Sequence, residues 1–266
     1  MPTLFSETHR FRLEKKLQVL TKQPPQTPIT LKLDSRRYVI KFSRRESGRF
    51  WRESLSALSC RLLFGLAIKP SAFRTEDNQY EAQRLQTLHS HNLAVPTLLL
   101  TQPNYIVMDY CGQSIEPLLK DPQSLHYLAP RIVNSLVELH ESNQWHGGAQ
   151  VRNLTLKQDV LFRIDFEERV GDILPLELAQ AYDVLLCFNS LAKYLDYDVK
   201  LGEQLLRQYL QQRQNPELQH ALQQILNHLL RLIHTTKPLH VLLRHRSDIQ
   251  RTCYFATILQ RSLQNS

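Results

Sequence analysis

The order of apolar and polar residues in the first part of the chain predicts a small sheet flanked by helices. Residues 30–42 (TLKLDSRRYVIKF) alternate between apolar and polar side chains around the turn-forming pair Asp34-Ser35, which is typical of a β-hairpin. Apolar residues then recur at helical spacing in two segments, and two apolar runs follow on either side of a Gln-Pro-Asn turn. These patterns predict helices over 53–68 and 76–90 and strands over 98–100 and 105–110.

The pattern changes after Gly112. Period-3.6 spacing with few β-branched residues predicts a largely helical second part, interrupted by the short apolar runs LTL and LFRIDF. We therefore predict an α+β protein with a strand-rich small lobe over 1–111, a helical large lobe over 112–266 and a cleft between them. The helices predicted for the large lobe cover 125–142, 176–195, 201–213, 216–234 and 239–263.

Composition and charge narrow the class of protein. The 266 residues are 42% hydrophobic and 22% charged, as in ordinary globular proteins. The formal net charge is +8, and residues 31–69 hold ten Lys or Arg against three acidic residues, which is typical either of a solvated basic face or of a surface for an anionic partner. No RNA-binding motif and no stripe of basic and aromatic residues occurs, so a nucleic acid is the weakest such partner. The four scattered cysteines fit neither a disulfide framework nor a zinc site, and the first residues lack a signal-peptide core, so we expect a cytoplasmic protein.

One stretch carries most of the chemical information: WHGGAQVRNLTLKQDVLFRIDFEE. His146 is followed seven positions later by Asn153, then by a predicted strand and by Asp165-Phe166. This order and spacing resemble the protein-kinase-like superfamily, in which a His-Asp-Asn catalytic loop precedes an Asp-Phe-Gly motif. The His-Gly opening looks closest to bacterial lipopolysaccharide kinases of the Kdo-kinase type, to small atypical kinases and to aminoglycoside phosphotransferases.

The resemblance implies a bilobal protein-kinase-like fold and a role for each matching residue. Asp165 and Asn153 would hold Mg²⁺ against the phosphates of ATP. Lys41, at the end of the YVIK strand, would contact the α- and β-phosphates, with Glu81 as its ion-pair partner and Glu53 as the alternative partner. The remaining matches are backbone or structural positions: Asp109 and Cys111 in a hinge that would bind the adenine edge, His146 bracing the catalytic loop, and Asp183 tethering it.

Two departures from the family pattern fall at chemically central positions. Gly148 stands where the family has its catalytic aspartate, and glycine can neither accept a proton nor orient a hydroxyl. No glycine occurs in residues 1–47, so the loop that normally approaches the phosphates cannot have its usual sequence.

Three nearby charged residues offer compensation. Glu167 and Glu168 follow the Asp-Phe pair, and one of these two carboxylates could act as a replacement base, with Glu167 as the candidate catalytic residue. The alternatives are that the pair repels phosphate or forms a solvated acidic turn. Arg152 could face the phosphates and act in catalysis, or lie at the surface as an ordinary arginine.

The sequence therefore favours an ATP-dependent phosphotransferase that acts on a hydroxyl of a sugar, lipid-linked or protein acceptor. The alternative is a pseudokinase that binds nucleotide or a partner protein without transfer, and transfer of a nucleotidyl group also stays open. The basic segment Arg44–Ile68 could dock on anionic lipid or lipopolysaccharide, at the periphery of the inner membrane, or simply pack on the small lobe.

Overall fold

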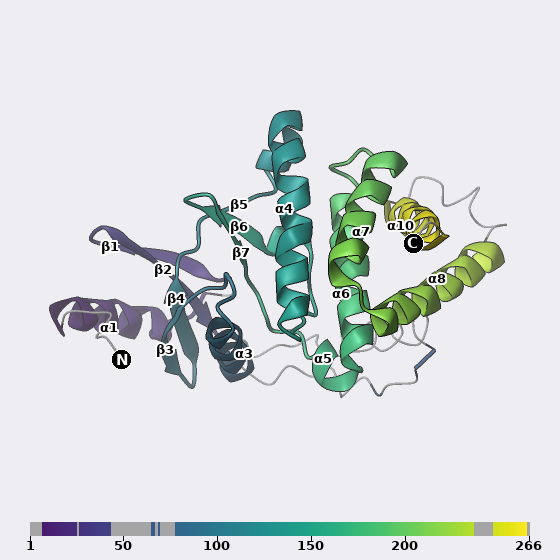
Figure 1. Ribbon diagram of the computed structural model, residues 1–266. Coiled ribbons are helices and arrows are strands. Elements are labelled where there is room, and N and C mark those ends of the chain that lie inside the picture. The colour runs from purple at the N-terminus through teal and green to yellow at the C-terminus, as the bar shows by residue number, and fades with distance from the viewer. Residues whose placement is uncertain are drawn as a thin grey trace.

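The computed structural model describes residues 7–25, 27–43, 65–66, 69, 78–236 and 247–264. It is an α+β structure with a four-stranded sheet towards one end and a group of packed helices towards the other (Figure 1). The strands are β1 (Ile29–Leu33), β2 (Arg36–Phe42), β3 (Leu98–Gln102), β4 (Tyr105–Asp109), β5 (Gln113–Ser114), β6 (Leu154–Lys157) and β7 (Val160–Arg163). The helices are α1 (Glu7–Lys22), α3 (Asn78–Ser90), α4 (Pro122–Glu141), α5 (Val170–Ile173), α6 (Leu176–Leu191), α7 (Val199–Arg213), α8 (Pro216–Thr236) and α10 (Ser247–Gln264), with 3₁₀ turns η2 (Leu118–Lys120) and η3 (Val151–Asn153).

The four-stranded sheet is antiparallel, in the order β1-β2-β4-β3. Successive side chains of a strand point to opposite faces. Along β2, Tyr38, Ile40 and Phe42 are therefore buried together with residues of α1, whereas Val39 and Lys41 face the other side, where a cavity opens. Helix α3 packs on β3 and β4. The sheet thus fixes the direction in which the Lys41 side chain leaves the backbone.

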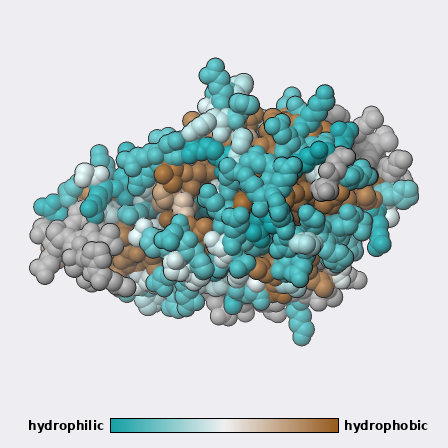
Figure 2. Space-filling model, viewed as in Figure 1, coloured by the Kyte–Doolittle hydropathy of each residue, from teal (hydrophilic) through white to brown (hydrophobic). Residues whose placement is uncertain are grey.

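The helices of the second part pack around a continuous apolar core. Helix α4 packs on α7, α6 on α8, and α10 on both α7 and α8. Phe188, Tyr209 and Phe255 are among the largest fully buried side chains of this core. On the face shown in Figure 2, hydrophilic side chains cover most of the helices. Among the described helices, none combines the length and the apolar sequence needed to cross a bilayer.

A second, three-stranded sheet links the two parts, in the order β5-β6-β7. Its antiparallel pairing places the end of η3 next to the end of β7, since Leu154 pairs with Arg163. The N–H of Arg163 also donates to the carbonyl of Ala94, after α3, at 3.0 Å. These bonds bring the segment that follows β7 to the open face of the larger sheet.

The predicted α+β class is confirmed, and the hairpin, the helix after residue 76 and both later strand pairs lie within a few residues of their predicted positions. The helix predicted over 176–195 ends at Leu191. Helix α1 was not predicted, because only Leu13 and Leu17 mark its buried side among many basic and polar residues. The predicted helix over 53–68 and the residues 239–246 lie wholly or almost wholly outside the described residues, and the lobe boundary at 111–112 stays a prediction.

Candidate active-site cavity

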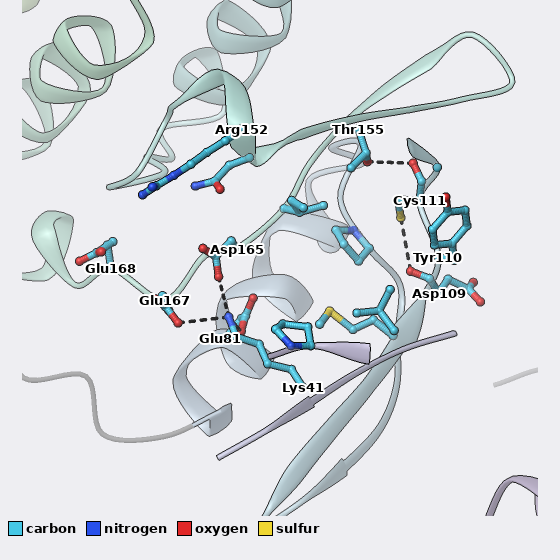
Figure 3. A pocket seen from close by; sticks show the side chains of 17 residues that line it. Lys41, Glu81, Asp109, Tyr110, Cys111, Arg152, Thr155, Asp165, Glu167 and Glu168 are labelled. Carbon is cyan, nitrogen blue, oxygen red and sulfur yellow. Dashed lines mark hydrogen bonds and ion pairs between the residues drawn. The ribbon is translucent and has the colours of Figure 1, made fainter. Parts of the chain in front are cut away.

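A cavity of about 690 Å³ opens on the face of the sheet that carries Val39 and Lys41. This volume lies within the range of small-molecule sites. Its walls come from β2, α3, the segment after β4, η3 and the loop after β7 (Figure 3). Nine residues singled out by the sequence line it: Lys41, Glu81, Asp109, Cys111, Arg152, Asn153, Asp165, Glu167 and Glu168.

Lys41 forms the centre of an ion-pair cluster at one end of this cavity. Its Nζ lies 2.7 Å from Glu81 Oε2, 2.6 Å from Asp165 Oδ1 and 3.1 Å from Glu167 Oε2. The start of α3 is held beside β2 because the Asn78 side-chain amide donates to the Lys41 carbonyl at 2.9 Å, one helical turn before Glu81. The structure thus brings together the lysine and the glutamate that the sequence predicted as partners.

The Lys41 cluster carries excess negative charge, and its Lys41–Glu81 pair is buried whereas Asp165 and Glu167 are partly exposed. The side chains of Lys41 and Glu81 are only 10% and 2% exposed. Burial alone would lower the pKa of Lys41, but the three carboxylates outweigh it and raise the pKa above its usual range. Among the described residues that line the cavity, five are acidic and two are basic, a formal charge of −3 in a chain of +8. Such a cavity attracts cations and disfavours a bare polyphosphate.

Asp165 and Asn153 supply oxygen atoms of the kind that Mg²⁺ prefers. Asp165 follows β7 and has φ 70°, a left-handed conformation that is uncommon outside glycine and that concentrates at functional sites. The Asn153 side-chain nitrogen donates to the Gly148 carbonyl at 2.9 Å, so the amide oxygen is the atom that would face a metal ion. One carboxylate and one amide oxygen, completed by substrate phosphates and water, suit Mg²⁺ in nucleotide sites. The donor set therefore fits the predicted ion.

The segment after β4 forms the opposite end of the cavity. The Thr155 hydroxyl donates to the Cys111 carbonyl at 2.8 Å, and the Cys111 thiol donates weakly to the Asp109 carbonyl at 3.6 Å. Within the described residues, none of the hydrogen bonds uses the Cys111 backbone N–H. Val39 and Met108 give this end apolar walls. A flat heterocycle with a polar edge fits this end, whereas the Lys41 end fits charged groups.

His146 and Asp183 lie buried beneath the cavity. Asp183 accepts the backbone N–H groups of His146 at 2.6 Å and Gly147 at 2.8 Å, and His140 Nε2 lies 3.4 Å from it. Burial alone would raise the pKa of Asp183, but these hydrogen bonds hold it below its usual value. Gly148 donates its N–H to His146 Nδ1 at 3.2 Å, so Nε2 is the nitrogen that donates to the Ile164 carbonyl, at 3.0 Å. Burial lowers the pKa of His146 to about 4, which keeps the ring neutral.

The loop that connects β1 to β2 contributes nothing to the cavity wall that the structure describes. Leu33 pairs with Arg36, so the connection is the two-residue turn Asp34-Ser35, with φ 55° at Asp34. All four residues except Leu33 are exposed. The chain that the structure describes thus has a two-residue turn between β1 and β2, and this turn does not line the cavity.

Several supporting residues were not predicted from the sequence. Arg84 of α3 donates to the Gln144 side chain at 2.9 Å and to the Trp145 carbonyl at 2.7 Å, and its guanidinium lies 4.0 Å from the Trp145 ring centroid. This contact joins α3, which carries Glu81, to the loop that begins at His146. The pair Gln144-Trp145 just before the His-Gly motif is the one sequence feature that could have indicated it.

Comparisons of the chain with protein-family models and with curated protein sequences found no match. The interpretation of the cavity therefore depends on its own geometry and chemistry.

Proposed function

We propose that the chain has a bilobal protein-kinase-like fold and acts as an ATP-dependent phosphotransferase at this cavity. One observation carries the proposal: a buried lysine of the sheet contacts both a glutamate of α3 and an aspartate of the loop after β7. Phosphoryl transfer requires mainly positioning and charge neutralisation. The cluster would position the lysine, and a metal ion held by Asp165 would add the positive charge that the cluster lacks. The apolar end bounded by the Asp109–Cys111 segment has the chemistry to hold an adenine.

In this proposal each residue binds or orients the nucleotide. The Lys41 ammonium would contact the α- and β-phosphates, while Glu81 keeps its side chain extended across the cavity. Asp165 and Asn153 would hold Mg²⁺, which supplies positive charge against the phosphates when it is bound. Arg152 lines the same end and would face the outer phosphate. Asp183 and His146 hold the loop that begins at His146 in one conformation, through the hydrogen bonds described above.

The acceptor is expected to be a hydroxyl of a sugar, a lipid-linked molecule or a protein. An anionic lipid or lipopolysaccharide is the acceptor that the basic segment 44–68 favours, and that segment lies almost wholly outside the described residues. Peripheral association with the inner membrane depends on the same segment and stays a prediction.

A second candidate is a pseudokinase that binds nucleotide and regulates a partner protein. The observation that favours it is Gly148, which leaves no side chain at the position of the expected proton acceptor. This candidate predicts the same binding of Mg²⁺ and ATP without transfer of phosphate.

Thermal unfolding in the presence of ATP and Mg²⁺ tests the proposal. A ligand at 100 times its Kd stabilises a protein by about 2.7 kcal/mol, or several degrees in a chain of this size. We expect that rise for the wild type and its loss in Asp165→Asn, because asparagine tolerates the same left-handed backbone but carries no charge. Asp196→Asn is the matched control, since Asp196 also has a positive φ (48°) and is exposed away from the cavity. An unchanged midpoint of the wild type at millimolar ATP would contradict the proposal.

A further inference from the structure

We propose that Glu168 supplies the carboxylate that accepts the proton of the acceptor hydroxyl, in place of the side chain that Gly148 lacks. This inference rests on the proposed function, since a proton acceptor matters only where a phosphoryl group is transferred. From the sequence alone the role stays open between Glu167, the candidate residue, and Glu168; the geometry favours Glu168.

Two successive glycines allow Glu168 to approach the loop. Gly147 has φ +83°, and a Cβ on it would lie 2.8 Å from the Glu168 Cβ and 3.1 Å from the Glu168 carbonyl oxygen, closer than side chains pack. At Gly148, a Cβ would have the Glu168 Cγ 3.7 Å away. One more carbon–carbon bond of about 1.5 Å leads to the carboxyl carbon, which keeps it within about 5 Å of the position of a side chain at 148. The Glu168 side chain thus lies beside the position from which an aspartate at 148 would project.

The neighbouring carboxylate, Glu167, is directed towards Lys41. Glu167 Oε2 lies 3.1 Å from the Lys41 ammonium, inside the ion-pair cluster. Glu168 lines the cavity together with Arg152 and Asn153. In Figure 3, Glu168, Arg152 and Asp165 lie at the same end of the cavity, away from Asp109 and Cys111. An acceptor that enters at this end meets Glu168 next to the outer phosphate.

The proposed step moves one proton to Glu168 and one phosphoryl group to the acceptor hydroxyl. The Glu168 carboxylate takes the proton of the acceptor hydroxyl while the hydroxyl oxygen forms its bond to the γ-phosphorus. The bond from that phosphorus to the β–γ bridging oxygen breaks, and its electron pair leaves with ADP. Glu168 then releases the proton to water. With water as the acceptor, the same step releases inorganic phosphate.

Release of labelled phosphate from ATP in Mg²⁺, with water as the acceptor, measures this step in the full chain. We expect Glu168→Gln to slow phosphate release on the order of 10²-fold or more. The midpoint shift with ATP and Mg²⁺ should stay that of the wild type, because Glu168 is not expected to bind the nucleotide. Glu217→Gln, an exposed carboxylate on α8, is the matched control and should leave the rate unchanged.

A second variant separates proton transfer from a structural role. The Cβ of a residue at 148 would meet only ordinary contacts, at 3.5 Å or more, so the backbone there accepts a side chain without a clash at Cβ. Phosphate release should therefore recover in Gly148→Asp/Glu168→Gln. A wild-type rate in Glu168→Gln, or no recovery in the double variant, would overturn the inference. Binding of ATP and Mg²⁺ by the wild type without phosphate release would also overturn it and favour the pseudokinase, whereas absence of binding would instead contradict the proposed function.

Discussion

Replacing Lys41 by methionine should show how much the Lys41 ammonium group contributes to the stability of the protein. At 2.7 Å from Glu81, with an effective dielectric constant of about 20, the attraction amounts to about 6 kcal/mol before desolvation is subtracted. Removing one partner of such a buried pair costs about 3–5 kcal/mol, because the other charge stays buried without compensation. We therefore expect Lys41→Met to lower the free energy of unfolding by about 3–5 kcal/mol at pH 7.

The double variant Lys41→Met/Glu81→Gln distinguishes lost charge pairing from lost packing. Glutamine keeps the size of Glu81, which is 2% exposed, but removes its charge, so the double variant should be more stable than Lys41→Met alone by about 2 kcal/mol. Urea unfolding followed by circular dichroism measures all four proteins of the cycle. Additive effects of the two substitutions, or a cost of Lys41→Met below about 1 kcal/mol, would refute the reasoning.

Three further predictions concern the framework of the site. Asp183→Ala removes the acceptor of the His146 and Gly147 N–H groups, both buried, and should lower the free energy of unfolding by at least about 3 kcal/mol in urea titrations. Burial lowers the pKa of His146 from 6.5 to about 4, so the unfolded chain binds a proton first as the pH falls. The contribution of His146 to the free energy of unfolding should thus fall by about 3 kcal/mol between a pH above 6.5 and a pH below 4. In His146→Asn, the fall in the free energy of unfolding over this pH range should be smaller. Gly112→Ala should greatly lower the melting temperature, since Gly112 has φ +101° and a Cβ would collide with the Leu156 carbonyl, and a midpoint near that of the wild type would contradict this.

The sequence was sufficient to predict those cavity residues that lie at the ends of strands, because the strand pattern fixes their positions along the chain. Lys41 ends an alternating strand, and Asn153 and Asp165 flank a short hairpin, so their order along the chain reflects neighbouring positions in space. Glu81 could be preferred to Glu53 as the partner of Lys41 only because of the residues around it, since the number of residues between the lysine and its partner does not follow from regular structure. The structure pairs Lys41 with Glu81, whereas Glu53 lies outside the described residues.

Other parts of the site depend on backbone conformations that residue spacing does not encode. The approach of Glu168 to the loop follows from the positive φ of Gly147 and the path of the chain after Asp165. Two adjacent glutamates look alike in the sequence, yet the structure pairs Glu167 with Lys41 and packs Glu168 against Gly147. The direction of the turn between β1 and β2 likewise depends on the register of the hairpin.

Isothermal titration of ATP into the protein, once in Mg²⁺ and once in EDTA, tests the central claim most directly. The cavity has a formal charge of −3, and its described wall includes no residue of the turn between β1 and β2, so in the proposed function a nucleotide would depend on a metal ion and on Lys41 for compensating charge. The account predicts saturable binding of one ATP per chain in Mg²⁺ and at least about tenfold weaker binding in EDTA. Binding of equal strength in both buffers, or no binding in either, would contradict it.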